Sequence, residues 1–266
     1  MKTILVTGST DGIGRATARE LAERGCAVVV HGRNERRATV AARELADATG
    51  NRRVTAVAGD FASLAGVRAL AAQVRDACPR LDVLINNAGL AVRRRRTSKD
   101  GYESTFAVNH LAPFLLTNLL LDRLRASAPA RIVNVSSGVH TSGRIDFDDL
   151  QMERGFDGWQ AYCNSKFANA LFTCELAHRL DAAEVTANFL HPGVIDTKLL
   201  HVNFGGGSPV ADGARTPLHL ALAPDVADVT GAYFVNRRQT RASSAAGDRR
   251  LAAELWRVSA SLTGLT

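Results

Sequence analysis

The chain has 266 residues, of which 46% are hydrophobic and 22% charged, the proportions of an ordinary soluble globular protein. Its four cysteines include no CxxC pair, which excludes a disulfide scaffold and the usual zinc patterns and favours a reducing compartment. The formal net charge is +7, the N-terminus lacks a signal-peptide pattern, and no segment approaches about 18 uncharged apolar residues, so we expect a cytoplasmic protein without membrane contact.

The first half of the chain alternates short apolar runs with longer stretches of helical period. Strands are expected at residues 4–6, 28–30, 54–57 and 81–85, and helices at 13–21, 36–48 and 64–77. Strands that alternate with helices predict repeated βαβ units. The expected fold class is therefore α/β, with a doubly wound parallel sheet of about seven strands and helices on both faces.

The second half continues this alternation with longer helices. One long helix is expected from Tyr102 to Arg125, with a kink at Pro113. The other expected elements are strands at 131–135 and 185–190, helices at 161–180 and 218–222, an edge strand at 232–235, and irregular segments at 136–160 and 193–215. No linker, repeat or low-complexity tract divides the chain, so residues 1–266 are expected to form one domain.

A glycine-rich turn joins the first expected strand to the first expected helix. It reads TGSTDGIG, with the spacing G-x-x-x-G-x-G. Glycine permits a tight turn and lets backbone N–H groups approach a phosphate, and the following helix directs its positive end to the same place. The turn indicates a dinucleotide pyrophosphate site, although an ordinary glycine-rich turn would read the same way. The residues assigned to the cofactor here are Gly8, Ser9, Thr10, Asp11, Gly12, Ile13, Gly14 and Arg15.

The end of the second strand indicates which dinucleotide binds. An NAD site usually has a carboxylate there, which accepts hydrogen bonds from the ribose hydroxyls. Residues 30–34 read VHGRN and contain no acid. A guanidinium binds a 2′-phosphate through charge-assisted hydrogen bonds, whereas a carboxylate would repel it. Arg33, with Asn34 beside it and Arg15 as a second cation, therefore predicts NADP(H), unless Arg33 is an ordinary surface residue.

Tyr162 and Lys166 lie four residues apart at the start of an expected helix, in the sequence YCNSK. Residues at i and i+4 share one helix face, so the phenol and the ammonium can point into one site. A nearby positive charge lowers the pKa of a tyrosine toward the range useful for acid–base catalysis. Such a pair often arises by chance, but this one follows a strand that ends in Ser136 and Ser137, at the sheet edge where ligands bind.

Together these motifs resemble the short-chain dehydrogenase/reductase family over nearly the whole chain. The matching sequences are TGSTDGIG at 7–14, NNAG at 86–89, VNH at 108–110, NVSS at 134–137, YCNSK at 162–166 and HPG at 191–193. The long segment between Ser137 and Tyr162 and the tail at 255–265 are similar to the retinol-dehydrogenase-like branch. The resemblance implies a single-domain Rossmann fold and an NADP(H)-dependent oxidoreductase that transfers a hydride between nicotinamide and a carbonyl/alcohol pair.

The resemblance also implies a catalytic tetrad of Asn109, Ser137, Tyr162 and Lys166. Tyr162 would be the general acid in reduction and the base in oxidation, and Ser137 would hydrogen-bond the substrate oxygen. Lys166 would bind the nicotinamide ribose and depress the pKa of Tyr162. Asn109 would hold a water molecule that connects Lys166 to solvent. Ser136 is the alternative to Ser137, and the family pattern favours the second serine.

Further positions match the family's cofactor contacts. They are Asp60, Phe61, Asn87, Ala88, Gly89, Pro192, Gly193, Val194 and Thr197, together with Tyr162 and Lys166. Asp60 or Ser63 could equally cap the helix that follows. For Asn86 we expect a role in tying strands together, and for His191 a structural role, because the tetrad already supplies an acid. No metal site is expected.

The substrate is expected to lie among three loops, at residues 90–100, 138–160 and 195–215. Apolar side chains there favour a hydrophobic or aromatic ketone or aldehyde, retinoid-like or polyketide-type, although they could instead pack the loops down. These side chains are Phe147, Leu150, Met152, Phe156 and Trp159, and Leu199, Leu200 and Phe204. The run Arg93 to Arg96 is either a solvated loop or a contact for an anionic substrate. No aromatic residues interleave with this run, so nucleic-acid binding is not expected.

Two further expectations concern the class of protein and its assembly. The alternative to an enzyme is a non-catalytic, nucleotide-binding redox sensor or regulatory protein on the same fold, which the complete tetrad disfavours. Apolar positions on the two long helices exceed the needs of one sheet face, so a homodimer or homotetramer is expected. These positions are Leu111, Phe114, Leu115, Leu171, Phe172 and Leu176. The long loop or the C-terminal tail could block one such interface.

Overall fold

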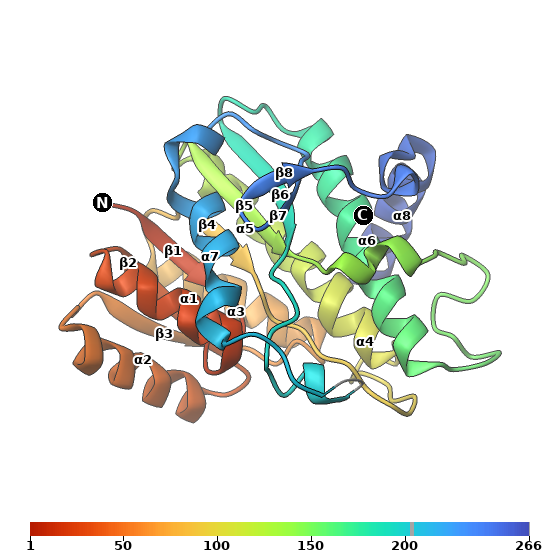
Figure 1. Ribbon diagram of the computed structural model, residues 1–266, viewed down its shortest axis with the longest axis horizontal. Helices are drawn as coiled ribbons and strands as arrows, with labels where there is room; N and C mark the ends of the chain where they lie inside the picture. The colour runs from red at the N-terminus through yellow and green to blue at the C-terminus, as the bar shows by residue number, and fades with distance from the viewer. Residues whose placement is uncertain (203–204, 266) are drawn as a thin grey trace.

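Eight strands form one sheet in the order β3-β2-β1-β4-β5-β6-β7-β8, at the centre of Figure 1. The structure, a computed structural model, describes residues 1–202 and 205–265. Strands β1 to β7 are parallel, and the strand order reverses between β1 and β4, where ligands bind in such sheets. The strands are β1 Thr3–Val6, β2 Ala27–Gly32, β3 Val54–Ala58, β4 Val83–Asn86, β5 Ala130–Val135, β6 Val185–His191, β7 Tyr233–Val235 and β8 Arg238–Thr240. The expected α/β fold with a doubly wound sheet is confirmed.

The expected count of about seven strands is one too low, because the short antiparallel strand β8 covers the edge of β7. The segment at 232–235 is therefore not the edge of the sheet. Asn236 and Arg237 form the turn between the two strands, with φ values of 50° and 65°. All three residues of β8 are exposed and none is apolar, so no hydrophobic alternation marks this strand in the sequence.

Helices cover both faces of the sheet, and successive residues of each strand face opposite sides. The helices α1, α2 and α7 pack on the face that includes Ile4 and Val28. On the other face, α3, α5 and α6 pack against Leu5 and Val29. The helices are α1 Gly12–Glu23, α2 Glu35–Thr49, α3 Leu64–Ala77, α4 Ser104–Phe106, α5 Ala112–Arg125, α6 Gly158–Arg179, α7 Val210–Leu222 and α8 Arg249–Thr263.

The helix expected from Tyr102 to Arg125 is interrupted by a π-helical turn at Ala107–Leu111, between α4 and α5. The distortion therefore lies before Pro113, which occupies the first turn of α5, where a missing N–H is tolerated. Among the described residues, the segment Ser104–Arg125 is the one helix long and apolar enough to cross a membrane, and 83% of its window is buried inside the fold. This is the usual property of a core helix.

Two helices begin earlier than the sequence predicts. The helix α6 begins at Gly158 rather than at residue 161, and α7 begins at Val210 rather than at residue 218. Pro217 lies inside α7. Because proline normally ends a helical period, the sequence pattern does not predict the part of the helix that precedes Pro217. The end of the segment expected to be irregular, residues 210–215, is therefore helical.

The C-terminal helix α8 lies beside α6, at the right of Figure 1, and covers the apolar sides of α5 and α6. The Trp256 ring packs against Phe114, with centroids 4.9 Å apart, and against Phe172 at 5.8 Å. The six apolar side chains on which the expected oligomer rested are each exposed by 3% or less within the single chain. The argument from surplus apolar surface is therefore wrong, because the chain buries these side chains itself.

Candidate active site

The glycine turn and the end of β4 interlock at the carboxyl edge of the sheet. Gly8 and Gly12 have φ values of 64° and 54°, which residues with a side chain rarely adopt. A Cβ on Gly8 would lie 2.8 Å from the Cα of Ala88, and a Cβ on Gly14 would collide with the amide of Asn87. Glycine is thus required here, and the turn leads directly into the N-terminus of α1. This arrangement fits the pyrophosphate of a dinucleotide.

His31, to which the sequence motifs did not point, supports this turn from β2. The Gly8 N–H donates to Nδ1 of His31 at 3.0 Å, and Nε2 lies 2.9 Å from the carbonyl oxygen of Gly59. Because an amide N–H can only donate, Nδ1 accepts and Nε2 carries the proton. Burial lowers the pKa of His31 to about 4, so the ring is neutral. Phe61, a predicted cofactor residue, is buried and stacks on His31 with centroids 4.7 Å apart.

Three other predicted cofactor residues use their side chains to hold the site together. The Ser9 hydroxyl donates to a carbonyl of β1 at 2.7 Å, and the Asn87 amide donates to the carbonyl of Thr7 at 2.8 Å. The Asn34 side chain accepts a hydrogen bond from the first turn of α2 and caps that helix. These side chains brace the turn and the sheet edge, so contacts of these residues with a dinucleotide would come from their backbones.

Asp60, expected at the adenine, forms an ion pair with Lys99 at 3.3 Å. The sequence left open whether Asp60 or Ser63 caps the following helix. The structure selects Ser63, whose hydroxyl accepts from an N–H in the first turn of α3. The Asp60 carboxylate is thus free of the cap and lies at the end of β3.

Arg33 is exposed just beyond β2 and has no ion-pair partner among the described residues. The preceding residue, Gly32, is tightly enclosed, since a Cβ there would lie 2.8 Å from Cγ2 of Thr10. Arg15, the second expected cation, is instead paired with Glu44 at 2.8 Å. The strand end therefore presents an unpaired guanidinium near the glycine turn and no carboxylate in the position typical of NAD sites. These residues fit a 2′-phosphate.

The segment after β6 passes from the sheet edge to the start of α1. Residues 192–194 leave the strand, and a methyl group of Thr197 lies 3.6 Å from the Cβ position of Gly12. The next residue, Lys198, forms an ion pair with Asp11, the N-cap of α1. Of the expected cofactor residues in this segment, Thr197 therefore lies beside the glycine turn.

Tyr162 and Lys166 lie on one face of α6, as their spacing predicts. The Lys166 Nζ is 5.5 Å from the centroid of the Tyr162 ring and donates to the carbonyl of Val135 at 2.9 Å. Burial lowers the pKa of Lys166 to about 8. Burial also raises the pKa of Tyr162, and a hydrogen bond with Ser137 opposes this rise only in part. The expected lowering of the pKa of Tyr162 is therefore wrong here, because desolvation dominates and keeps the phenol protonated.

The two serines after β5 have different surroundings. Ser136 is 2% exposed, and its hydroxyl donates to the backbone carbonyl of Lys166 at 2.9 Å. Ser137 hydrogen-bonds with Tyr162 and caps the 3-10 turn Gly138–Ser142. Ser136 thus fastens α6 to β5, and Ser137 is the serine that lies with the tyrosine, as the family pattern favoured.

Asn109 lies in the π-helical turn with a fully engaged amide. Its Nδ2 donates to the carbonyl of Leu90 and to the hydroxyl of Ser165, each at 2.9 Å, and its Oδ1 accepts from the Leu90 N–H at 2.8 Å. A Cβ on Gly89 would lie 3.4 Å from this Oδ1 and 3.7 Å from the Nζ of Lys166. Asn109 is therefore close to Lys166, but both of its amide hydrogens are taken. The expected water molecule could only donate to this side chain.

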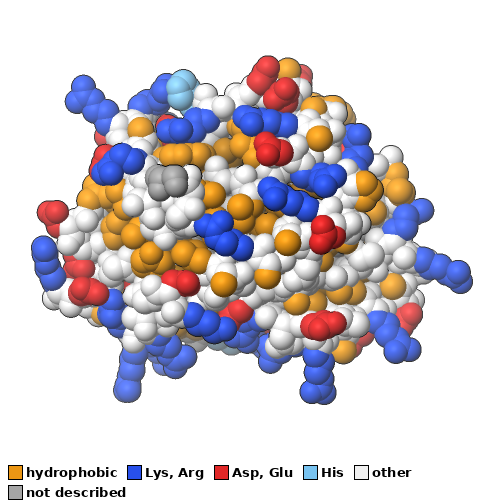
Figure 2. Space-filling view, turned by 180° about the vertical axis from the view of Figure 1, so that it is seen from behind, with side chains coloured by type: hydrophobic (Ala, Val, Ile, Leu, Met, Phe, Trp, Pro, Cys, Tyr) orange, Lys and Arg blue, Asp and Glu red, His pale blue; other side chains and the backbone are white. Residues whose placement is uncertain are grey.

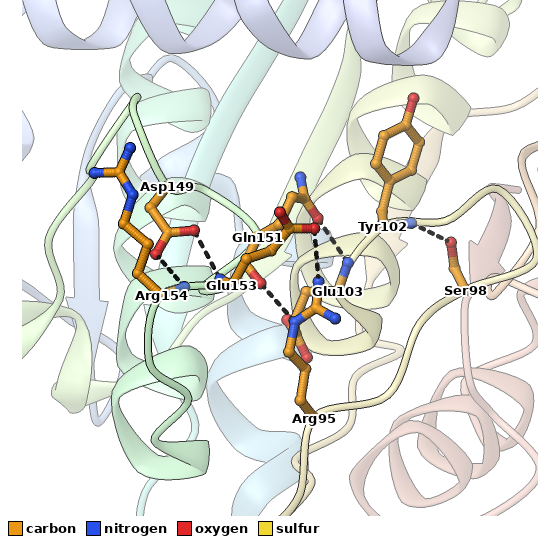
Figure 3. A network of polar contacts seen from close by, with 8 residues as sticks. All are labelled: Arg95, Ser98, Tyr102, Glu103, Asp149, Gln151, Glu153 and Arg154. Carbon is orange, nitrogen blue, oxygen red and sulfur yellow. Dashed lines mark hydrogen bonds and ion pairs between the residues drawn. The ribbon is translucent and has the colours of Figure 1, made fainter.

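The arginine run connects the loops around this site. Arg93 donates through Nε to the carbonyl of Val202 at 2.7 Å, and Arg95 donates through Nε to the carbonyl of Gln151 at 3.0 Å. Arg95 also forms an ion pair with Glu153 at 3.3 Å, as Figure 3 shows. Alternate members of the run therefore join the three loops expected to surround the substrate.

The remaining two arginines of the run, Arg94 and Arg96, are exposed, and neither has an ion pair with another described residue. On the face of the molecule in Figure 2, the coloured Lys and Arg side chains are scattered among apolar and acidic ones. The residues coloured there form no continuous basic stripe of the kind that follows a nucleic-acid backbone.

None of the described apolar side chains expected at the substrate is fully buried: Phe147 is exposed and the others are half-buried. Phe147 is 37% exposed, and Leu150 packs against the core between α6 and α8. The centroid of the Trp159 ring lies 6.3 Å from that of the Tyr162 ring, so this side chain of the set lies beside the tyrosine. Phe204 lies outside the described residues.

Comparison with known proteins decides the family. The family model described as short chain dehydrogenase matches residues 2–204. The chain belongs to the short-chain dehydrogenase family. Retinol dehydrogenase 13 of Homo sapiens is 43% identical to this dehydrogenase over 281 residues, which cover 99% of this chain and 85% of that protein.

Two solved structures are similar to the dehydrogenase. An uncharacterised protein from Mycobacterium paratuberculosis superposes with a TM-score of 0.82 at 35% identity, covering 99% of this chain and 94% of that one. A short chain dehydrogenase from Shigella flexneri complexed with NADP gives a TM-score of 0.73 at 28% identity, covering 89% and 97%. The resemblance seen in the motifs is confirmed, and the dehydrogenase is an oxidoreductase that acts on CH–OH groups. The non-catalytic alternative is not supported.

Proposed function

We propose that this dehydrogenase uses NADP(H) to interconvert a hydrophobic or aromatic carbonyl compound and its alcohol. The observation that carries the cofactor assignment is the exposed Arg33, which has no ion-pair partner in the described part of the chain, next to the enclosed Gly32. A 2′-phosphate would give this guanidinium a charge-assisted contact. The similar Shigella flexneri structure was solved with NADP, which supports the assignment.

The roles of the site residues follow from their geometry. NADP(H), when bound, supplies or accepts the hydride. In reduction, Tyr162 gives its proton to the carbonyl oxygen, and its raised pKa keeps that proton in place until the oxygen becomes basic. The Ser137 hydroxyl, next to the phenol, stabilises the charge that develops on the substrate oxygen. The Lys166 ammonium, 5.5 Å from the ring, then stabilises the phenolate that remains.

The substrate class rests on the loops. Arg93 and Arg95 donate hydrogen bonds to backbone carbonyls of neighbouring loops. Two of the four arginines at 93–96 are therefore already engaged and are less able to bind an anionic substrate. Trp159 places an apolar surface near Tyr162. The similar human protein is named a retinol dehydrogenase, and retinol is an apolar alcohol, which supports an apolar substrate here. An extended apolar or aromatic carbonyl, retinoid-like or polyketide-type, therefore fits better than a sugar or a small acid.

The test is a panel of carbonyl compounds with NADPH and with NADH, followed at the nicotinamide absorbance band. The panel contains all-trans-retinaldehyde, aryl ketones, bicyclic β-diketones and, as polar controls, glyceraldehyde and pyruvate. We expect turnover with at least one apolar compound and NADPH. Turnover confined to the polar controls contradicts the substrate class, and faster turnover with NADH contradicts the cofactor assignment.

A further inference from the structure

A buried histidine joins the turn of the catalytic serine to a distant part of the chain. His140 is 1% exposed, and its Nδ1 lies 2.8 Å from the carbonyl oxygen of Ser137. On the opposite side of the ring, the backbone N–H of Ser243 donates to Nε2 at 3.3 Å. Ser243 follows β8, beyond residue 204, where the match to the family model ends.

These two contacts fix the protonation state of the ring. An amide N–H can only donate, so Nε2 of His140 must be without a proton. A carbonyl oxygen can only accept, so Nδ1 must carry the proton that it donates to Ser137. A doubly protonated ring would direct an N–H at the N–H of Ser243. Burial lowers the pKa of His140, which favours the same neutral form.

The surroundings of the ring leave it little freedom to move. Tyr233 of β7 and Phe189 of β6 meet the His140 ring in edge contacts, with centroids 4.8 and 5.9 Å away. The His140 N–H also donates to the Ser137 carbonyl, at 3.2 Å, so this oxygen is held from two directions. The position of Ser137 is thus coupled both to β6 and β7 and to the segment that contains Ser243.

The titratable neighbours of the ring are few among the described residues. His191, at the end of β6, has Nε2 3.6 Å from the Cβ position of Gly138, and burial is the main cause that lowers its pKa, with a smaller electrostatic effect from the neighbouring His140 and Lys166. Burial raises the pKa of Tyr233 to about 12, so that phenol stays neutral. The ring of His140 therefore has neutral groups on both strands against which it packs.

We propose that His140 is a positioning residue, which sets the place of Ser137 beside Tyr162 and makes it depend on the C-terminal segment at Ser243. This inference rests on the proposed role of Ser137. Displacing a reacting group by about 1 Å can lower the rate about 100-fold. The hydrogen bond from His140 to the Ser137 carbonyl can therefore affect kcat although His140 touches no substrate.

Two amide variants separate the two contacts, because each copies one nitrogen of the ring. His140→Asn keeps a donor near the place of Nδ1, and His140→Gln keeps an acceptor near the place of Nε2. We expect kcat to fall about 10–100-fold in His140→Gln and several-fold less in His140→Asn, with the Kd for NADPH changed by less than about twofold in both. The rate is measured with NADPH and the carbonyl compound that the panel turns over fastest. Equal kcat in the two variants, or a loss of kcat matched by a loss of NADPH binding, overturns the proposal.

Matched controls and a spectroscopic test complete the experiment. His178 is exposed in the last turn of α6, at the other end of that helix from Tyr162, and His178→Asn and His178→Gln should leave kcat unchanged. In protein labelled with 15N in histidine, the imidazole nitrogen shifts should show the Nδ1–H tautomer for His140 and no protonation from pH 8 down to about 5.5. An Nε2–H tautomer, or a pKa for His140 near 6.5, refutes the arrangement. This readout needs no turnover, so a panel without an accepted carbonyl would refute the proposed function alone.

Discussion

Replacing Arg33 with alanine is expected to remove most of the preference for NADPH over NADH. The guanidinium is exposed and lacks an ion pair within the described structure, so its truncation leaves no other group without a partner. A hydrogen bond to a charged group contributes about 1.5–3 kcal/mol, and solvent exposure places this one toward the lower end. At about 1.4 kcal/mol per factor of ten, the Kd for NADPH should rise about 10-fold, and at most about 100-fold. The Kd for NADH should change by less than about twofold, because it has no phosphate there.

Reversing the preference requires more than an acid at the strand end. A Cβ on Gly32 would lie 2.8 Å from Cγ2 of Thr10 and 3.2 Å from the backbone nitrogen of Ala38. Thr10→Ser removes that methyl group and keeps the hydroxyl. The triple variant Thr10→Ser/Gly32→Asp/Arg33→Ala should therefore prefer NADH. The double variant Gly32→Asp/Arg33→Ala should bind both cofactors weakly, since the aspartate is forced against Thr10.

The assay is the Kd for NADPH and for NADH, measured by nicotinamide fluorescence in each protein. Arg52→Ala is the matched control, because Arg52 is an exposed arginine that precedes β3, at the opposite end of the sheet from the glycine turn. If the native protein binds NADH as tightly as NADPH, or if Arg33→Ala changes the ratio no more than Arg52→Ala does, the cofactor assignment is wrong.

Three further predictions concern the chemistry, the loops and the C-terminal helix. Tyr162→Phe should lower kcat about 10²–10⁴-fold while the Kd for NADPH is retained, and a kcat near the native value would reject the acid role. Arg95→Ala removes the contacts to Gln151 and Glu153 and should raise KM for a bulky apolar carbonyl more than Arg94→Ala does; equal KM values would show that these contacts do not shape the site. Trp256→Ala should lower the free energy of unfolding by about 2–3 kcal/mol and promote self-association in sedimentation, whereas an unchanged melting curve would contradict the role given to α8.

The parallel part of the sheet could be predicted because its strands are apolar runs bounded by glycines, and the helices between them keep a clear period. The strand β8 could not, because its three residues are exposed and polar and the pairing with β7 that holds them is not visible in the sequence. The π-helical turn could not be predicted from the sequence either. Its Asn109 contacts Leu90 and Ser165, which are distant in the chain, and the sequence shows only the proline.

In the site, the motifs located the tyrosine, the lysine and the glycine turn, since these residues are close in sequence to elements that position them. The supporting residues could not be found in this way. His31 and His140 support the site through hydrogen bonds to a backbone carbonyl and a backbone amide, and these groups come from other parts of the chain. The direction of the shift in the pKa of Tyr162 was missed for the same reason, because desolvation depends on everything that surrounds the ring and spacing shows only the lysine.

The position of α8 has a consequence for the behaviour of the protein on dilution. Because α8 belongs to the same chain as α5 and α6, covering this apolar face is a unimolecular event, which involves no loss of translational freedom between separate molecules. A helix supplied by a second subunit would dissociate as the protein concentration fell, and the stability of the face would fall with it. Here the contact of Trp256 with Phe114 and Phe172 is independent of concentration. The same helix α6 that receives this cover also carries Tyr162 and Lys166, so the support of the active site should be as complete at nanomolar as at millimolar protein.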